Sequence, residues 1–269
     1  MSTQIFLKKD LYPPCLFGVC IMALCRFLKA LWGSRDKIGE KIPSTPFYLQ
    51  SLRDLKVITM LLLTGHYKAS MAILRSSIEN FLIGAYFDYK ILTSESKKDI
   101  VENVRNYLET GKYNVPDEDY QKARKVCKDL SKDKFLWFNN LARYLKIEGI
   151  LEENMYSEFV RLYKELNAYV HPKTFEDPNK GYPVWPAAVS IVREDYEKCI
   201  ENVQRALVLE IELAWNLYCK RYDIVDKDEF IDSLKYIVKI EDFERHFGKK
   251  AVFVKRLKAT IKEIKSKLS

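Results

Sequence analysis

An apolar segment at residues 67–92 constrains this chain more than any other feature of its sequence. Apolar side chains recur in it at the three- and four-residue spacing of one helix face, namely Met71, Leu74, Ile78, Phe81, Ala85 and Leu92. Ile73, Ile83 and Phe87 lie on the other side of the same helix. A helix that is apolar on nearly all sides is surrounded by other helices, so the segment predicts the central helix of a bundle.

The scarcity of turn-forming residues supports the same class of fold. The 269 residues include only 9 Gly and 9 Pro, and 48% of them are hydrophobic against 30% charged. An all-β protein needs many turns, and a disordered chain has few apolar residues. We therefore predict an all-α fold, a bundle of long helices with few connections.

Proline-containing segments divide the chain into three predicted parts. Residues 1–46 form an N-terminal helix and linker docked on the body, residues 47–222 form the bundle, and residues 223–269 form a basic helical extension. Within the bundle we expect helices at 48–64, 67–92, 94–109, 117–130, 135–149, 155–171 and 193–222. Gly65 is the expected stop of the first of these helices, and Pro172 ends the helix that precedes it.

Residues 11–25, with Lys8 and Lys9 before them, loosely resemble the apolar and charged parts of a signal peptide. Pro13 and Pro14 break this run, and Arg26 and Lys29 interrupt it before it reaches the roughly 18 uncharged residues that a membrane helix requires. We interpret residues 16–32 as a helix docked on the body, with a peripheral membrane contact as the alternative. The six cysteines include no C-x2-C pair, which favours reduced thiols in a cytoplasmic protein and gives no indication of a metal or cofactor.

The net charge of +8 suggests an anionic partner, and the excess is concentrated near the C-terminus. The basic residues of the last predicted helix include Lys249, Lys250, Lys255, Arg256, Lys258 and Lys262. A solvated face opposite a packed apolar seam is the simplest interpretation. A contact with the phosphate backbone of a nucleic acid, or with anionic lipid, is the functional one.

Two charged residues stand alone in the central helix. Between Ala69 and Phe87 only Arg75 and Glu79 are charged, and their spacing of four places them on one side of the helix. If Ile78 faces the core, both lie at the margin of the apolar face, where burial of ions is costly. The pair is interpreted either as a structural ion pair, which we favour, or as a polar site in the wall of the bundle.

A second polar set lies on the helix before Pro172. Lys164, Asn167 and His171 are spaced three and four residues apart and share a face roughly 140° from the apolar stripe around Leu166. His171 falls in the last turn, where unpaired carbonyl groups favour a protonated imidazole. It is interpreted as a helix cap or as a general acid–base group.

Two motifs together resemble the HEPN superfamily. They are Leu-Arg-Ser-Ser-Ile-Glu at 74–79 and Glu-Leu-Asn-Ala-Tyr-Val-His-Pro at 165–172, within a region of similarity at about 50–220. The resemblance implies a helical bundle that is commonly dimeric. Many members are metal-independent ribonucleases of defence or toxin systems, and others only bind RNA or nucleotides.

The resemblance also implies roles for individual residues. His171 matches the family histidine and Asn167 the polar position, whereas the family arginine shortly before the histidine is replaced, and Lys164 or Arg75 would have to supply its charge. We therefore expect an RNA-engaging protein, as a homo-oligomer, with a ribonuclease site at His171, Asn167, Arg75, Glu79 and Lys164 as one version. The alternatives are a non-enzymatic RNA- or ribosome-binding module, which the missing arginine favours, and a peripheral membrane protein.

Overall fold

A computed structural model describes residues 44–170 and 193–221, together with the single positions 259, 262 and 266. Every regular element in these ranges is helical: α3 (Thr45–Leu63), α4 (Tyr67–Thr93), α5 (Lys97–Thr110), α6 (Asp117–Arg124), the 3-10 helix η1 (Lys132–Lys134), α7 (Phe138–Ile147), α8 (Glu153–Val170), α9 (Arg193–Ala214) and the π-helix η2 (Trp215–Arg221). The predicted all-α class is confirmed. The segments 1–43 and 222–258 lie outside the described residues, so the three-part division stays a prediction.

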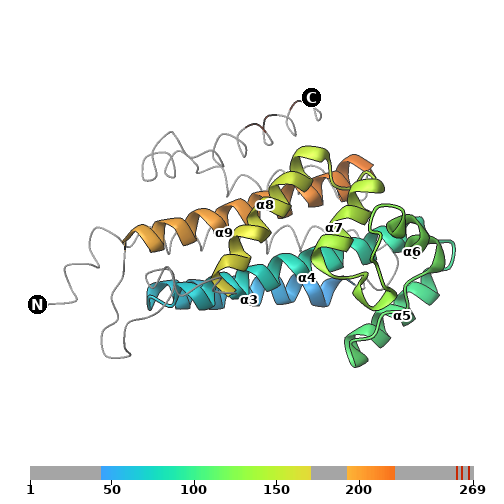
Figure 1. The fold of residues 1–269 in the computed structure, drawn as a ribbon, viewed down its shortest axis with the longest axis horizontal. Coiled ribbons are helices and arrows are strands. Elements are labelled where there is room, and N and C mark those ends of the chain that lie inside the picture. The colour runs from blue at the N-terminus through green and yellow to red at the C-terminus, as the bar shows by residue number, and fades with distance from the viewer. Residues whose placement is uncertain (1–43, 171–192, 222–258, 260–261, 263–265, 267–269) are drawn as a thin grey trace, which may run out of the picture.

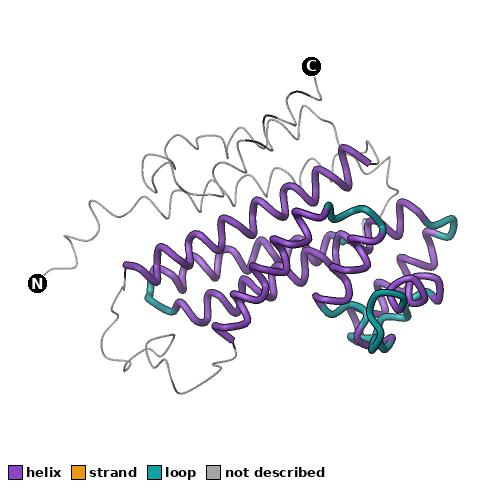
Figure 2. Tube along the Cα trace, turned by 45° about the horizontal axis from the view of Figure 1, so that its top comes forward, coloured by secondary structure: helices purple, strands orange, loops and turns teal. Residues whose placement is uncertain are grey.

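The helix predicted to be central is α4. It packs against α3, α5, α7, α8 and α9, and all residues from 81 to 89 are buried. Figure 1 shows α3 and α4 lying side by side, with α9 running along them, α8 crossing obliquely, and α5 to α7 gathered at one end. Most of the short loops lie at that end (Figure 2). The apolar periodicity of the sequence therefore identified the core of the bundle correctly.

Glycines permit two local features that the bundle needs. Gly65 has φ 75°, and it ends α3 as predicted, because Gly65 N–H bonds the carbonyl of Leu62 while His66 N–H bonds that of Leu61. Gly84 in α4 lies against α3: a Cβ atom there would stand 2.9 Å from Tyr48 Cε1. Helices α3 and α4 approach closely because this position carries no side chain.

Two predicted helices differ from the structure. The helix expected at 117–130 ends at Arg124, since the chain turns back so that the Tyr120 hydroxyl donates to the carbonyl of Leu130 at 2.9 Å. The helix expected at 135–149 begins at Phe138. Trp137 is extended (φ −64°, ψ 141°), which lets Phe135 enter the core while Trp137 remains 60% exposed.

The apolar stripe predicted on α8 is confirmed over most of its length. Met155, Phe159, Leu162 and Leu166 are buried, while Val170 is only half-buried. A network around Arg205 joins this helix to α9, with Arg205 within 2.6 Å of Glu165 and 2.9 Å of Glu158.

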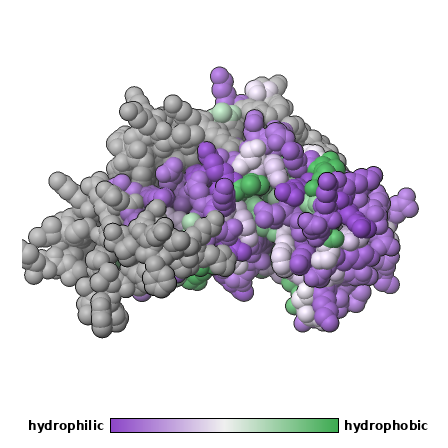
Figure 3. Space-filling view, viewed as in Figure 1, coloured by the Kyte–Doolittle hydropathy of each residue, from purple (hydrophilic) through white to green (hydrophobic). Residues whose placement is uncertain are grey.

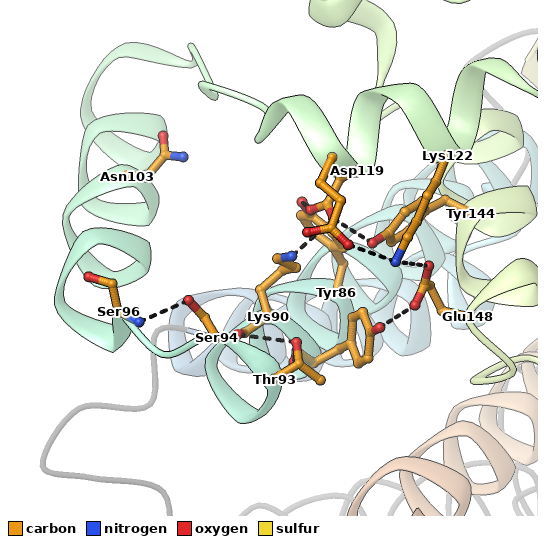
Figure 4. Close-up of polar contacts among 12 residues, drawn as sticks. Tyr86, Lys90, Thr93, Ser94, Ser96, Asn103, Asp119, Lys122, Tyr144 and Glu148 are labelled. Carbon is orange, nitrogen blue, oxygen red and sulfur yellow. Dashed lines mark hydrogen bonds and ion pairs between the residues drawn. The ribbon is translucent and has the colours of Figure 1, made fainter.

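A buried carboxylate fixes α6 and α7 to the central helix (Figure 4). Asp119 of α6 is 1% exposed, and its oxygens accept hydrogen bonds from Tyr86 at 2.8 Å, Tyr144 at 2.7 Å and Lys90 at 2.9 Å. A buried charge is tolerated where hydrogen bonds and an opposite charge compensate its desolvation. Asp119 therefore helps to position α7, which forms part of the site described below.

A second buried carboxylate joins α3, α4 and η2. Asp88 accepts hydrogen bonds from Tyr48 and Tyr218, whose hydroxyl oxygens lie 2.5 Å apart. Burial raises the pKa of Asp88 to about 6, against the opposing effect of these donors.

Among the described helices, none combines the length and apolar character that crossing a membrane requires.

Candidate functional site

A cavity of about 750 Å³ opens where α4, α5, α7 and α8 meet, and we call it the Arg75 pocket. Helix α4 contributes Arg75 and Glu79, and α8 contributes Tyr163. Parts of segments 107–115 and 132–140 form the remaining walls. The volume is in the range of small-ligand sites.

Tyr163 joins the charged pair that the sequence singled out. Arg75 Nε donates to Glu79 Oε1 at 3.2 Å and to the Tyr163 hydroxyl at 3.0 Å, and that hydroxyl donates to Glu79 Oε1 at 2.5 Å. The side chains of Arg75 and Glu79 are 25% and 32% exposed, as expected for the margin of the core. The pair is thus bonded within α4 and also to α8.

The guanidinium group of Arg75 is held by one nitrogen and leaves two others accessible. Its Cζ atom lies 5.0 Å from the centroid of the Tyr163 ring, a cation–π distance. Among the described residues, Nη1 and Nη2 have no hydrogen-bond partner. A fixed guanidinium with two free donors at a pocket wall is suited to bind an anion such as a phosphate.

Tyr163 is itself held by packing. Its ring stacks on Phe138, the first residue of α7, with centroids 3.7 Å apart and planes inclined by 3°. Burial, followed by the neighbouring carboxylate of Glu79, raises the pKa of Tyr163 to about 12. The hydroxyl therefore stays protonated near neutral pH and remains a donor to Glu79.

The loop after α5 forms one wall of the Arg75 pocket and is held in place by hydrogen bonds from side chains of α5. The side chain of Asn103 donates to the carbonyl of Asn114 at 2.6 Å and accepts from the backbone N–H of Asn114 at 3.0 Å. The side chain of Asn106 donates to the carbonyl of Lys112 at 3.0 Å. Tyr113 is fixed from behind by its hydroxyl, 3.1 Å from that of Tyr86. This wall is therefore formed before any ligand arrives.

The opposite wall carries an exposed indole. On the face drawn in Figure 3 the described surface is mostly hydrophilic, and apolar side chains form only small patches. Trp137 nevertheless exposes 60% of its surface, with Lys134 Nζ 5.1 Å from its ring centroid.

Two lysines that line the pocket differ in their ion pairing. Lys132 pairs with Asp117 at 2.5 Å, whereas Lys112 has no ion-pair partner among the described residues.

The structure brings together two of the five predicted catalytic residues. Arg75 and Glu79 share the pocket, whereas neither Lys164 nor Asn167 lines it. Lys164 is exposed, and Asn167 is half-buried with an Oδ1 atom that has no hydrogen-bond partner in the described part of the chain. His171 lies outside the described residues, so its position relative to the pocket stays a prediction.

Most of the predicted basic patch also lies outside the described residues, namely Lys249, Lys250, Lys255, Arg256 and Lys258. Lys262 is described as helical and exposed. Within the part of the chain that the structure covers, no group of three or more His, Cys, Asp or Glu is arranged to hold a metal ion.

Tyr163, Tyr113 and Trp137 were not predicted as site residues from the sequence. Tyr163 stands four residues before Asn167, so it shares the polar side of α8, and that spacing was the available signal.

Comparison of the chain with family models, with curated proteins and with solved structures yields no match in any of the three. We therefore infer the function from the geometry of the pocket.

Proposed function

We propose that the protein engages single-stranded RNA, with a phosphate of the RNA bound by Arg75. The observation that carries the proposal is the guanidinium of Arg75, held through Nε by Glu79 and Tyr163 and presenting Nη1 and Nη2 in a pocket with aromatic walls. Guanidinium groups bind phosphates through paired donors, and aromatic rings accommodate unpaired bases. The HEPN-like motifs and the net charge of +8 support the same class of partner.

The charge of the pocket agrees with this assignment. The pocket is lined by three cationic side chains, those of Arg75, Lys112 and Lys132, and by two carboxylates, those of Glu79 and Asp133. Cations therefore outnumber carboxylates in its lining. Lys112 has no carboxylate partner within the described residues, which leaves its charge available to a second phosphate. Each phosphate contact of this kind makes the affinity fall with rising salt concentration.

Binding of a labelled single-stranded RNA to the full chain, followed by fluorescence anisotropy, tests the proposal. Loss of a charge-assisted contact weakens binding by about 1.5–3 kcal/mol, so we expect Arg75→Ala to lower affinity by at least about tenfold. Arg75→Lys keeps the charge but loses the paired donors, and we expect an intermediate affinity. Arg161→Ala is the matched control, because Arg161 is 60% exposed and pairs within α8 with Glu158.

Equal affinities of the wild type, Arg75→Ala and Arg161→Ala would contradict the proposal. A melting curve for each variant establishes that it is folded. If neutralisation of Lys255, Arg256 and Lys258 alone abolished binding, the RNA would be bound by the basic C-terminal segment, as the non-enzymatic alternative from the sequence predicts.

Ribonuclease activity at the same pocket is a second proposal. It is favoured by the carboxylate of Glu79, 3.2 Å from Arg75, since cleavage of RNA requires a proton acceptor near a cation that offsets phosphate charge. We expect the wild type to cleave RNA in the presence of EDTA and Glu79→Gln to abolish cleavage. His171→Ala, at a position outside the described residues, tests the version of the site predicted from the sequence, which requires loss of cleavage with nearly unchanged melting temperature. Intact RNA after incubation with the wild type would exclude this activity while leaving the binding proposal in place.

A further inference from the structure

We propose that the Arg75 pocket accepts one unpaired base of the RNA, stacked on Trp137 and read at its edge by asparagine amides. This inference rests on the proposed function and specifies the part of the RNA that enters the pocket. A phosphate alone would need only the cations. Five aromatic residues line the cavity as well, namely Tyr107, Tyr113, Trp137, Phe138 and Tyr163.

Trp137 is the ring available for stacking. Tyr163 and Phe138 already stack on each other, and Tyr113 is engaged with the rings of Tyr86 and Phe87. Trp137, in contrast, is 60% exposed at the start of α7, and Lys134 Nζ lies 5.1 Å from its centroid. Exposure of a large aromatic side chain has no benefit for folding, whereas stacking of a base on such a ring contributes about 1–3 kcal/mol.

Amide groups supply the polar complement that a base edge requires. Asn114, Asn139 and Asn140 line the pocket. Within the described residues the side-chain amides of Asn114 and Asn139 have no partner, and Asn140 uses only Nδ2, which donates to the carbonyl of Lys134 at 2.8 Å. Asparagine presents a donor beside an acceptor, the pattern that pairs with the edge of a nucleobase, adenine above all.

The pocket is also prepared to receive a base. Asn103 and Asn106 pin the backbone of the wall that carries Lys112 and Asn114. A preformed site avoids the entropy of ordering a loop on binding. Since the faces of a base are covered by its stacked neighbours in a duplex, only an unpaired base can stack on Trp137.

The test compares two labelled oligomers of equal length on the full chain, a short oligoadenylate and the corresponding abasic ribose-phosphate oligomer. Both carry the same phosphates, so they share the contacts to Arg75. We expect the abasic oligomer to bind the wild type about tenfold more weakly, the equivalent of one stacked base. Trp137→Ala should lower the affinity for oligoadenylate to the abasic level and leave the affinity for the abasic oligomer unchanged.

Ile147→Ala is the matched control, because Ile147 is an exposed apolar residue of α7 (45%) at the end of the helix farther from Trp137. It should leave both affinities unchanged, and Trp137→Phe should restore part of the oligoadenylate affinity. If wild type binds both oligomers equally, or if Trp137→Ala has no effect, the base subsite is refuted while RNA binding stands. If neither oligomer binds, the proposed function itself is refuted.

Discussion

Tyr163 makes the difference between a common surface ion pair and a fixed polar site. An exposed i,i+4 ion pair contributes about 0.3–0.5 kcal/mol and leaves both side chains free to move. The hydroxyl of Tyr163 bonds both partners, and its ring lies against Phe138. The orientation of the guanidinium is therefore set by a residue that has no charge of its own.

Replacing that hydroxyl tests this role. Tyr163→Phe keeps the stack on Phe138 and removes the hydrogen bonds, so we expect the free energy of unfolding to fall by about 1 kcal/mol. RNA affinity should fall about fivefold, since Arg75 loses part of its fixation. Tyr89→Phe loses an equivalent phenol–carboxylate bond, to Glu148, away from the pocket, and should reduce stability alone. Equal effects of both variants on affinity would disprove the positioning role.

At the scale of single residues the sequence revealed the charges of the site and missed its aromatic residues. Arg75 and Glu79 stand out because ions are rare in an apolar helix. Tyr163 is one of 17 tyrosines and lies 84 residues from Glu79 along the chain. Its spacing from Asn167 alone does not distinguish it from a core tyrosine, because its partners are assembled only by the packing of α8 on α4.

At the scale of elements, the pocket depends on how two short helices are attached. Helix α6 has few apolar residues, and its buried members are Asp119 and Ala123. Hydrophobic burial therefore contributes little to its docking. The hydrogen bonds and the ion pair of Asp119 hold it against α4 and α7, next to the loop that carries Lys112 and Asn114.

Asp119→Asn should consequently destabilise the protein. The variant leaves the side chain of Lys90, 13% exposed, without its countercharge, and we expect the free energy of unfolding to fall by about 3 kcal/mol. Asp117→Asn on the same helix removes an exposed ion pair with Lys132 and should have no measurable effect. Urea denaturation measures both, and equal stabilities of the two variants would contradict a buried hub at Asp119.

Periodicity located the long helices and failed where tertiary contacts decide. The apolar spacing in α4 and α8 reflects burial, so both helices were predicted within a few residues. In 117–130 the apolar residues Ala123, Cys127 and Leu130 imitate the same spacing, yet the chain turns after Arg124. The contact between Tyr120 and Leu130 that accompanies this turn cannot be deduced from spacing alone.

At the scale of the whole molecule, acidic side chains are buried in the body of the bundle. Glu210 of α9 is 2% exposed, and its Oε2 atom has no hydrogen-bond partner among the residues that the structure describes. Burial, with a smaller contribution from Asp54 of α3, raises the pKa of Glu210 to about 8. The folded protein therefore retains a proton that the unfolded chain releases from about pH 4.5 upward.

This difference predicts a pH dependence of stability with a definite sign. Because unfolding releases the proton, the contribution of Glu210 is greatest below about pH 4.5 and is lost as the pH rises towards 8. Relative to wild type, Glu210→Gln should gain stability between pH 5 and pH 8, on the order of 4 kcal/mol. Denaturant unfolding at several pH values measures it, with the exposed Glu201→Gln on α9 as control. A constant difference between wild type and Glu210→Gln across this range would refute the assignment.

The bundle as a whole places its candidate site at the end where α5, α6 and α7 meet α4 and α8, distant in sequence from the basic segment at 249–262. Photocrosslinking of a 4-thiouridine-substituted single-stranded RNA to the full chain, with mass spectrometric mapping, distinguishes these two regions directly. If RNA binds in the Arg75 pocket, we expect crosslinks within residues 107–115 and 132–140, and we expect Arg75→Ala to abolish them. Crosslinks confined to residues 249–262, or unchanged by Arg75→Ala, would contradict RNA binding in this pocket.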